Sequence, residues 1–179
     1  MKRLWCLLLG AIPGLGCASA GKDLPPLSVV PRLELQRYTG TWYEIARLPF
    51  SRQDGCHATT ATYRLRDDGK IAVTNRCRGG SFDGEERVAE GTAWVVDPAT
   101  NAKLKVSFFW PFSGDYWVIE LGEAAAGPYS HAVVGVPSRK YLWILSRTPK
   151  MDDALYRAIV KRAGAQGFEI GKLIRTPQR

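Results

Sequence analysis

From Thr41 onward, apolar and polar residues alternate in short segments that are separated by turn-forming residues. Alternation with a period of two is typical of a strand that buries one face. Asp67-Asp68-Gly69 is the clearest hairpin signal, because glycine adopts positive φ without a steric penalty. The regular spacing predicts an all-β antiparallel sandwich or barrel. Its eight expected strands are Thr41–Leu48, Thr59–Arg66, Lys70–Arg78, Arg87–Val96, Lys103–Phe109, Asp115–Leu121, His131–Val136 and Tyr141–Arg147.

After the eighth segment the period changes to that of a helix. Ala154–Ala163 contains no helix breaker, and Asp152 and Asp153 precede it, where negative charge stabilises a helix N-terminus. One more strand is expected at Phe168–Ile174. A narrow stripe of residues with helical spacing predicts that the helix packs against the outer wall of the sheet. The residues of this stripe are Leu155, Ala158, Ile159 and Arg162.

The first twenty residues have the order of a secretory signal peptide. Two basic residues precede the apolar run Leu4–Ile12, which is too short to span a membrane, and small residues follow. Ala18-Ser19-Ala20 fits ordinary cleavage after Ala20. Gly14-Leu15-Gly16-Cys17 instead resembles a bacterial lipobox, in which the cysteine is acylated and becomes the new N-terminus. We expect lipidation at Cys17.

This leader sets the expected organisation of the chain. Residues 1–20 are a lipoprotein-type signal peptide with cleavage before Cys17, residues 21–31 are a proline-rich extended tether, and residues 32–179 form the folded domain. Ala18, rather than an aspartate, follows Cys17. This predicts a lipid-anchored protein of the outer membrane that faces the periplasm, with a soluble periplasmic or secreted protein as the alternative.

Charge and composition narrow the class of partner. The chain has 25 Lys and Arg against 17 Asp and Glu, and this excess is scattered along the sequence, which disfavours nucleic acid as a partner. Aromatic residues make up 11% of the chain, and most lie in or beside the expected strands. Rings beside small residues such as Ala61 and Ala93 would shape an apolar pocket, and an eight-stranded barrel is just wide enough for one small ligand.

Motifs for catalysis are absent from the sequence. His57 and His131 lack the spacing of metal ligands, so neither a metal nor another cofactor is expected. Ser81 has no evident base, and the adjacent Glu85 and Glu86 would point to opposite faces of a strand. We therefore expect a protein that is not an enzyme.

Two cysteines, Cys56 and Cys77, remain beyond the leader. In an oxidising compartment they predict one disulfide. A two-residue loop at Asp68-Gly69 would leave them four residues out of register, a separation of about 13 Å that is too long for a bond. A bulge, or a first loop that curls back over the sheet, is expected to close this gap.

Four motifs, in order, give the chain a resemblance to a known family. Leu35–Ala46, which contains Gly40-Thr41-Trp42-Tyr43, closely resembles the opening motif of the lipocalins. It looks most like the bacterial outer-membrane lipocalins and the apolipoprotein D group. The turn Gly122–Pro128 matches the family's second motif poorly. Over residues 28–175, the further matches are Thr60–Tyr63 with Asp68–Ile71, Leu104–Phe109 and Tyr141–Arg147.

The resemblance implies an eight-stranded up-and-down β-barrel, the lipocalin calyx, with the C-terminal helix packed outside. Trp42 would lie at the closed end with Arg147 across its ring, in a structural cation–π contact. Alternation from Trp42 places Glu44 and Ala46 on the inner face of the same strand.

Alternation and the family match together assign the side chains that line the ligand cavity, and one bulge would invert the assignment on its strand. They are Ala61, Tyr63, Val73, Asn75, Ala93, Val106, Phe108, Tyr116, Val118, Ala132, Val134, Tyr141 and Trp143.

The function implied by the resemblance is binding, with carriage or storage of a fatty acid, a lysophospholipid or a similar amphiphile at the bacterial envelope. A carrier of a haem-like tetrapyrrole and a lipid-modifying enzyme on the same barrel are the alternatives. The expected partners are the small lipophilic ligand and the membrane, reached through the N-terminal lipid anchor. The oligomeric state is left open, a homodimer included.

Overall fold

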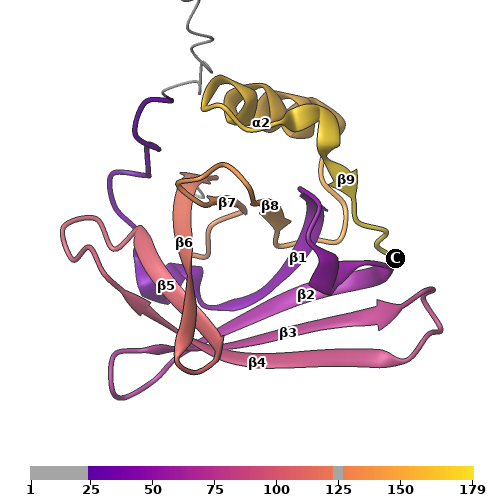
Figure 1. The fold of residues 1–179 in the computed structure, drawn as a ribbon, viewed down its shortest axis with the longest axis horizontal. Helices are drawn as coiled ribbons and strands as arrows, with labels where there is room; N and C mark the ends of the chain where they lie inside the picture. Colours follow the sequence, from indigo (N-terminus) through magenta and orange to yellow (C-terminus); the bar gives the residue numbers. More distant parts are fainter. Residues whose placement is uncertain (1–23, 123–126) are drawn as a thin grey trace, which may run out of the picture.

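Eight antiparallel strands form a closed barrel in the computed structural model, which describes residues 24–122 and 127–179 (Figure 1). Each strand pairs with the next along the chain, and the first strand closes the barrel by pairing with both the second and the eighth. The predicted up-and-down barrel is confirmed. The strands are β1 (Gly40–Arg47), β2 (Cys56–Leu65), β3 (Ile71–Gly79), β4 (Glu86–Val95), β5 (Lys103–Phe109), β6 (Phe112–Leu121), β7 (His131–Gly135) and β8 (Leu142–Ser146).

Two parts of the sequence-based predictions lie outside the described residues. The expected leader with Cys17 is one, and residues 123–126 of the poorly matched Gly122–Pro128 turn are the other. In the part of the chain that the structure describes, no helix is long and apolar enough to cross a membrane.

One long helix, α2 (Asp153–Ala165), covers the outside of the barrel, as predicted (Figure 1). Asp152 caps it, because its carboxylate accepts a hydrogen bond from the backbone N–H of Leu155 at 2.8 Å. Ile159 and Ala163 are fully or almost fully buried on the face that packs against the wall. The helix is therefore fixed at its first turn and along one stripe.

The predicted strand at Phe168–Ile174 is wrong. This segment forms a 3₁₀ turn, η2 (Ile170–Lys172), and only Ile174–Arg175 adds a short strand, β9, to the edge of β1. Phe168 instead packs against Gly135, where a Cβ would lie 2.5 Å from the Phe168 ring. Phe168 is buried in the outer apolar cluster and fixes this segment against the barrel wall.

Two short helices have no counterpart in the predicted elements. The four-residue α1 (Leu35–Tyr38) precedes β1, and the 3₁₀ turn η1 (Ser51–Gln53) lies in the connection from β1 to β2. Both are too short for their periodicity to show in a sequence.

Two apolar clusters lie on the two sides of the barrel wall. One fills the interior around Trp42, and the other lies between the wall and α2 around Ile159. Ala46 belongs to the outer cluster, so its predicted inward orientation is wrong. The pairing of β1 with β8 shifts between Glu44 and Ala46, and this bulge inverts the alternation that follows it.

The predicted disulfide between Cys56 and Cys77 is confirmed, with 5.5 Å between the two Cα atoms. The expected two-residue loop between β2 and β3 is wrong. The backbone N–H of Arg66 bonds to the Lys70 carbonyl, which leaves a three-residue loop with Gly69 at positive φ. The register of β2 against β3 also shifts between His57 and Thr60. These two irregularities remove two of the four residues of offset; Cys56 is paired with Gly79, so the disulfide joins positions that are still two residues apart in register.

The two ends of the barrel differ. Because successive strands are antiparallel, the turns after β1, β3, β5 and β7 share one end, here called the mouth, and Leu33 and α1 cover the other, here called the floor. The N-terminal segment runs from mouth to floor. Arg139, in the turn after β7, donates to the Pro25 carbonyl at 2.6 Å, and Leu33 donates from its backbone N–H to the Thr100 carbonyl at 2.7 Å.

Candidate functional site

Trp42 and Arg147 close the floor of the barrel. The Trp42 indole is fully buried and donates from Nε1 to the Tyr38 carbonyl at 2.9 Å. The Arg147 guanidinium lies over the ring, with Cζ 3.7 Å from the ring centroid. Its nitrogens also donate to the carbonyls of the chain around α1, including those of Thr39 and Thr41. This end of the barrel is therefore a sealed structural unit and not an entrance.

Three tyrosines form a hydrogen-bonded layer at the floor. The Tyr116 hydroxyl lies 2.7 Å from the Tyr38 hydroxyl and 2.8 Å from the Tyr63 hydroxyl. Burial raises the pKa of Tyr38 and of Tyr116 well above the usual value, and it raises the pKa of Tyr63 to about 12. The three groups are neutral at physiological pH, and they satisfy one another's hydrogen bonds without a ligand.

The interior is lined mainly by apolar side chains, and the structure brings most of the predicted ligand-lining residues together there. Pairing of Trp42 with Ala61, and of Ala61 with Asn75, sets the inner face of β1–β3. The predicted residues that belong to the interior cluster are Ala61, Tyr63, Val73, Ala93, Val106, Tyr116, Val118, Ala132, Val134 and Trp143.

Aromatic rings surround the mouth. Phe50, just before η1, makes edge contacts with Tyr141 and Trp143, at centroid distances of 5.1 and 6.0 Å. Phe108 is 43% exposed and lies against Gly91, where a Cβ would come within 2.8 Å of its ring. Phe108 and Tyr141 thus border the entrance and stand apart from the interior cluster, whereas Trp143 contacts both.

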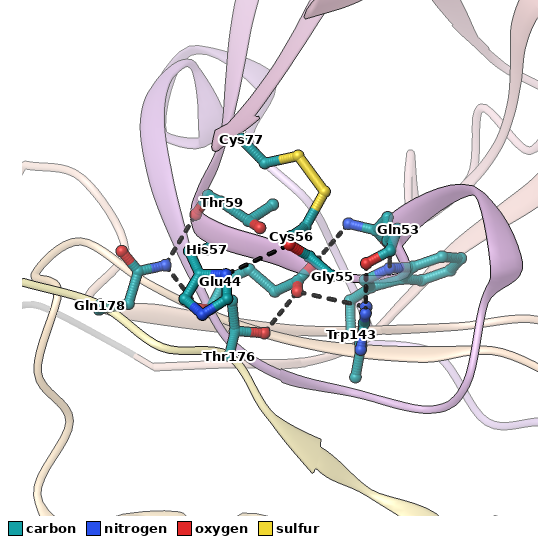
Figure 2. A network of polar contacts seen from close by, with 11 residues as sticks. Glu44, Gln53, Gly55, Cys56, His57, Thr59, Cys77, Trp143, Thr176 and Gln178 are labelled. Atoms are coloured by element: carbon teal, nitrogen blue, oxygen red, sulfur yellow. Dashed lines mark hydrogen bonds and ion pairs between the residues drawn. A yellow bond between two sulfur atoms is a disulfide. The ribbon is translucent and has the colours of Figure 1, made fainter. Parts of the chain in front are cut away.

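A polar network lies below the mouth, and Figure 2 shows it from close by. The Gln53 amide donates to the Glu44 carboxylate at 2.7 Å and accepts from Trp143 Nε1 at 2.9 Å. Thr176, after β9, donates to the second oxygen of Glu44 at 2.5 Å. Gln178 donates to the backbone carbonyls of Glu44 and Thr59 at 2.9 and 2.8 Å. The C-terminal segment therefore joins β1 to β2 where the two strands no longer pair.

Glu44 is the acid of this network, and it is almost completely buried. Burial raises its pKa, although the hydrogen bonds from Thr176 and Gln53 and the charge of Arg47 oppose the rise. Arg47 is 4% exposed; its Nη2 donates to the Gln53 carbonyl at 2.6 Å, and its Nε lies 3.7 Å from Glu44.

Sequence reasoning missed Arg47 as an interior residue. Alternation from Trp42 places position 47 on the outer face, and only the bulge before Ala46 returns it to the inside. The adjacent apolar pair Ile45-Ala46, which breaks the alternation, was the available signal.

Other parts of the surface are less suited to be the site. Hollows of about 700 and 570 Å³ lie outside the wall, where the N-terminal segment and α2 meet the barrel. Leu24 and Val29 of the N-terminal segment line these hollows, so the hollows follow the path of that segment over the barrel wall. Within residues 24–122 and 127–179, no three His, Cys, Asp or Glu side chains are placed to hold a metal ion. The interior and mouth are the candidate site.

A closed up-and-down barrel with a sealed floor, apolar walls and a helix outside defines the class of calyx-shaped binding proteins. The Lipocalin-like domain matches residues 33–178, and the chain belongs to this family.

Named relatives agree with this assignment. The chain is 40% identical to the outer membrane lipoprotein Blc of Vibrio cholerae, over 100% of both chains. It is 31% identical to apolipoprotein D of Macaca fascicularis, over 96% of this chain and 94% of that one. Insecticyanin of Manduca sexta shares the fold, with a TM-score of 0.66 at 21% identity over 87% of this chain and 86% of that one.

Proposed function

We propose that this protein binds and carries a single-chain lipid, a fatty acid or a lysophospholipid, inside the barrel at the bacterial envelope. The observation that carries the proposal is the interior itself, where apolar side chains from all eight strands face one another above a sealed floor. An acyl chain needs such a surface, and the aromatic mouth gives it one entrance.

The apolar walls supply enough free energy for reversible carriage. Burial of eight to ten methylene groups contributes about 6–8 kcal/mol before the entropy of association is subtracted. The resulting affinity, micromolar or weaker, would let the protein both take up and release its ligand.

Titration with a fluorescent fatty acid, followed by competition with unlabelled lipids, tests this function. We expect saturable binding of one ligand per chain and displacement by lysophospholipid. Native mass spectrometry of protein extracted from cells should show an added lipid mass. A purified, folded protein that binds neither ligand would contradict the proposal.

We further propose that Cys17 is acylated and holds the barrel at the outer membrane, facing the periplasm. Relatives named as outer membrane lipoproteins support this, and so does the course of the N-terminal segment. Residues 24–25 lie at the mouth, where Arg139 holds Pro25, so an anchor a few residues upstream would keep the entrance near the lipid surface.

The anchor is tested by Cys17→Ser. We expect the variant to move from the membrane to the soluble periplasmic fraction and to lose the mass of its acyl chains. An unchanged mature mass and unchanged fractionation would favour ordinary cleavage after Ala20.

A further inference from the structure

Three polar side chains on neighbouring strands have buried atoms that make no hydrogen bond. Among the described residues, Arg47 Nε and Nη1 on β1, Thr59 Oγ1 on β2 and Asn75 Oδ1 on β3 have no hydrogen-bond partner. Arg47 and Thr59 are each only 4% exposed. Buried polar groups are normally satisfied, so three on one side of one barrel require an explanation.

The strand pairings place these groups along one side of the interior. Asn75 pairs with Ala61, which is at the level of Trp42, and Thr59 lies two residues nearer the mouth on the same strand as Ala61. Arg47 is nearer the mouth still, opposite Trp143 of β8. The three therefore run from the lower wall towards the entrance, across β1, β2 and β3.

The contacts of Arg47 hold the guanidinium in place without satisfying it. One nitrogen donates to the Gln53 carbonyl, and Glu44 lies 3.7 Å from Nε, beyond hydrogen-bond distance. Both carboxylate oxygens of Glu44 are already engaged, by Thr176 and by Gln53. Nη1 is left with two N–H donors and no acceptor in the described structure.

We propose that Arg47, with Thr59 and Asn75, binds the oxyanion of the lipid headgroup, a fatty-acid carboxylate or a lysophospholipid phosphodiester, inside the barrel below the mouth. This inference rests on the proposed function and specifies the headgroup. An oxyanion accepts several charge-assisted hydrogen bonds, which is what the unpaired guanidinium donors and the Thr59 hydroxyl offer. The Asn75 amide can contribute its N–H groups as donors if its two terminal atoms are exchanged.

The position of the headgroup determines the path of the acyl chain through the barrel. From the β1–β3 side, the acyl chain extends across the interior towards the apolar walls of the opposite strands, where Val106, Val118 and Val134 face inward. The phosphodiester and carboxylate share this placement, because both present oxygens at the end of one acyl chain.

Arg47→Gln tests the inference, with three ligands that share a twelve-carbon chain: dodecanoate, dodecanol and lauroyl lysophosphatidylglycerol. We expect the Kd for both anionic ligands to rise at least tenfold, while the Kd for dodecanol changes less than twofold. Arg52→Gln, at an exposed arginine of η1, is the matched control and should change none of the three.

Thr59→Val and Asn75→Leu provide a second test that leaves the Arg47–Glu44 pair intact. Each should weaken dodecanoate binding severalfold and leave dodecanol unchanged, even if Arg47→Gln does not fold. Equal loss for dodecanoate and dodecanol, or no loss for the anions, would overturn the inference while the proposed function stands. Failure of the native protein to bind any of the three would overturn both.

Discussion

The guanidinium of Arg147 lies 3.7 Å from the centroid of the Trp42 ring. Because Arg147 directly follows β8 and Trp42 lies in β1, this contact joins the last barrel strand to the first across the floor. The same guanidinium donates to backbone carbonyls from Arg37 to Thr41, so one side chain fixes both the indole and the loop that seals the barrel.

Arg147→Ala should lower the free energy of unfolding by about 2–4 kcal/mol. The loss combines the cation–π contact with charged hydrogen bonds that leave several carbonyls without a donor. Urea denaturation measures it, with Arg66→Ala, at an exposed surface ion pair, as the control that should change stability by less than about 1 kcal/mol.

Trp42→Ala should lower the free energy of unfolding by about 3–5 kcal/mol, because it removes the largest fully buried side chain and opens a cavity at the floor. Thermal melts and urea denaturation check the value. A loss below about 1 kcal/mol would show that the floor does not depend on this ring.

Phe108→Asp should abolish fatty-acid binding and leave the barrel folded. A charge at this position would meet the ligand's acyl chain at the entrance, while 43% exposure lets water solvate it when no ligand is bound. Titration with a fluorescent fatty acid and a thermal melt give the two readouts. Val88→Asp, at an exposed outward position of β4, is the control and should bind normally.

The hairpin tip between β5 and β6 should contribute to membrane association. Phe109, Trp110 and Phe112 are 73, 79 and 71% exposed, and they lie at the mouth, the end at which Pro25 is held. Replacing all three by serine should reduce co-sedimentation of the unacylated domain with anionic vesicles severalfold, because aromatic rings partition to the bilayer interface. Val96→Ser, an exposed apolar residue near the floor, should not reduce it.

Acid should weaken the attachment of α2 to the wall. Burial raises the pKa of Glu120, but hydrogen bonds from Arg162 and His131 and their charges outweigh this and hold it at about 2. A lowered pKa in the folded state gives stability that is present above pH 4.5 and is lost as the pH falls towards 2. The loss should be about 1–2 kcal/mol, since Arg162 is exposed to solvent. Denaturation of wild type and Glu120→Gln at pH 6 and pH 3 measures it; the variant should show a smaller decrease.

The strand order, the outer helix and most of the inner face could be predicted from the sequence, because period-two alternation carries that information directly. Prediction failed where local geometry departs from regular pairing. Ala46 faces α2 because of one bulge in β1, and the same bulge brings Arg47 inside. The hydrogen bonds among Tyr38, Tyr63 and Tyr116 join three segments that are distant in sequence, so no local sequence pattern predicts them.

The seam between β1 and β2 has a consequence for the order of folding. Thr176 and Gln178 bond to Glu44 across sequence separations of 132 and 134 residues, and Gln178 also reaches Thr59. A chain that crosses a membrane N-terminus first can form its early hairpins locally, but its wall stays incomplete at this seam until residue 178 has emerged. Contacts between such distant residues form slowly. Strand pairing closes the barrel at β8, but the part of the β1–β2 seam nearest the mouth gains its last hydrogen bonds only when the C-terminal residues dock.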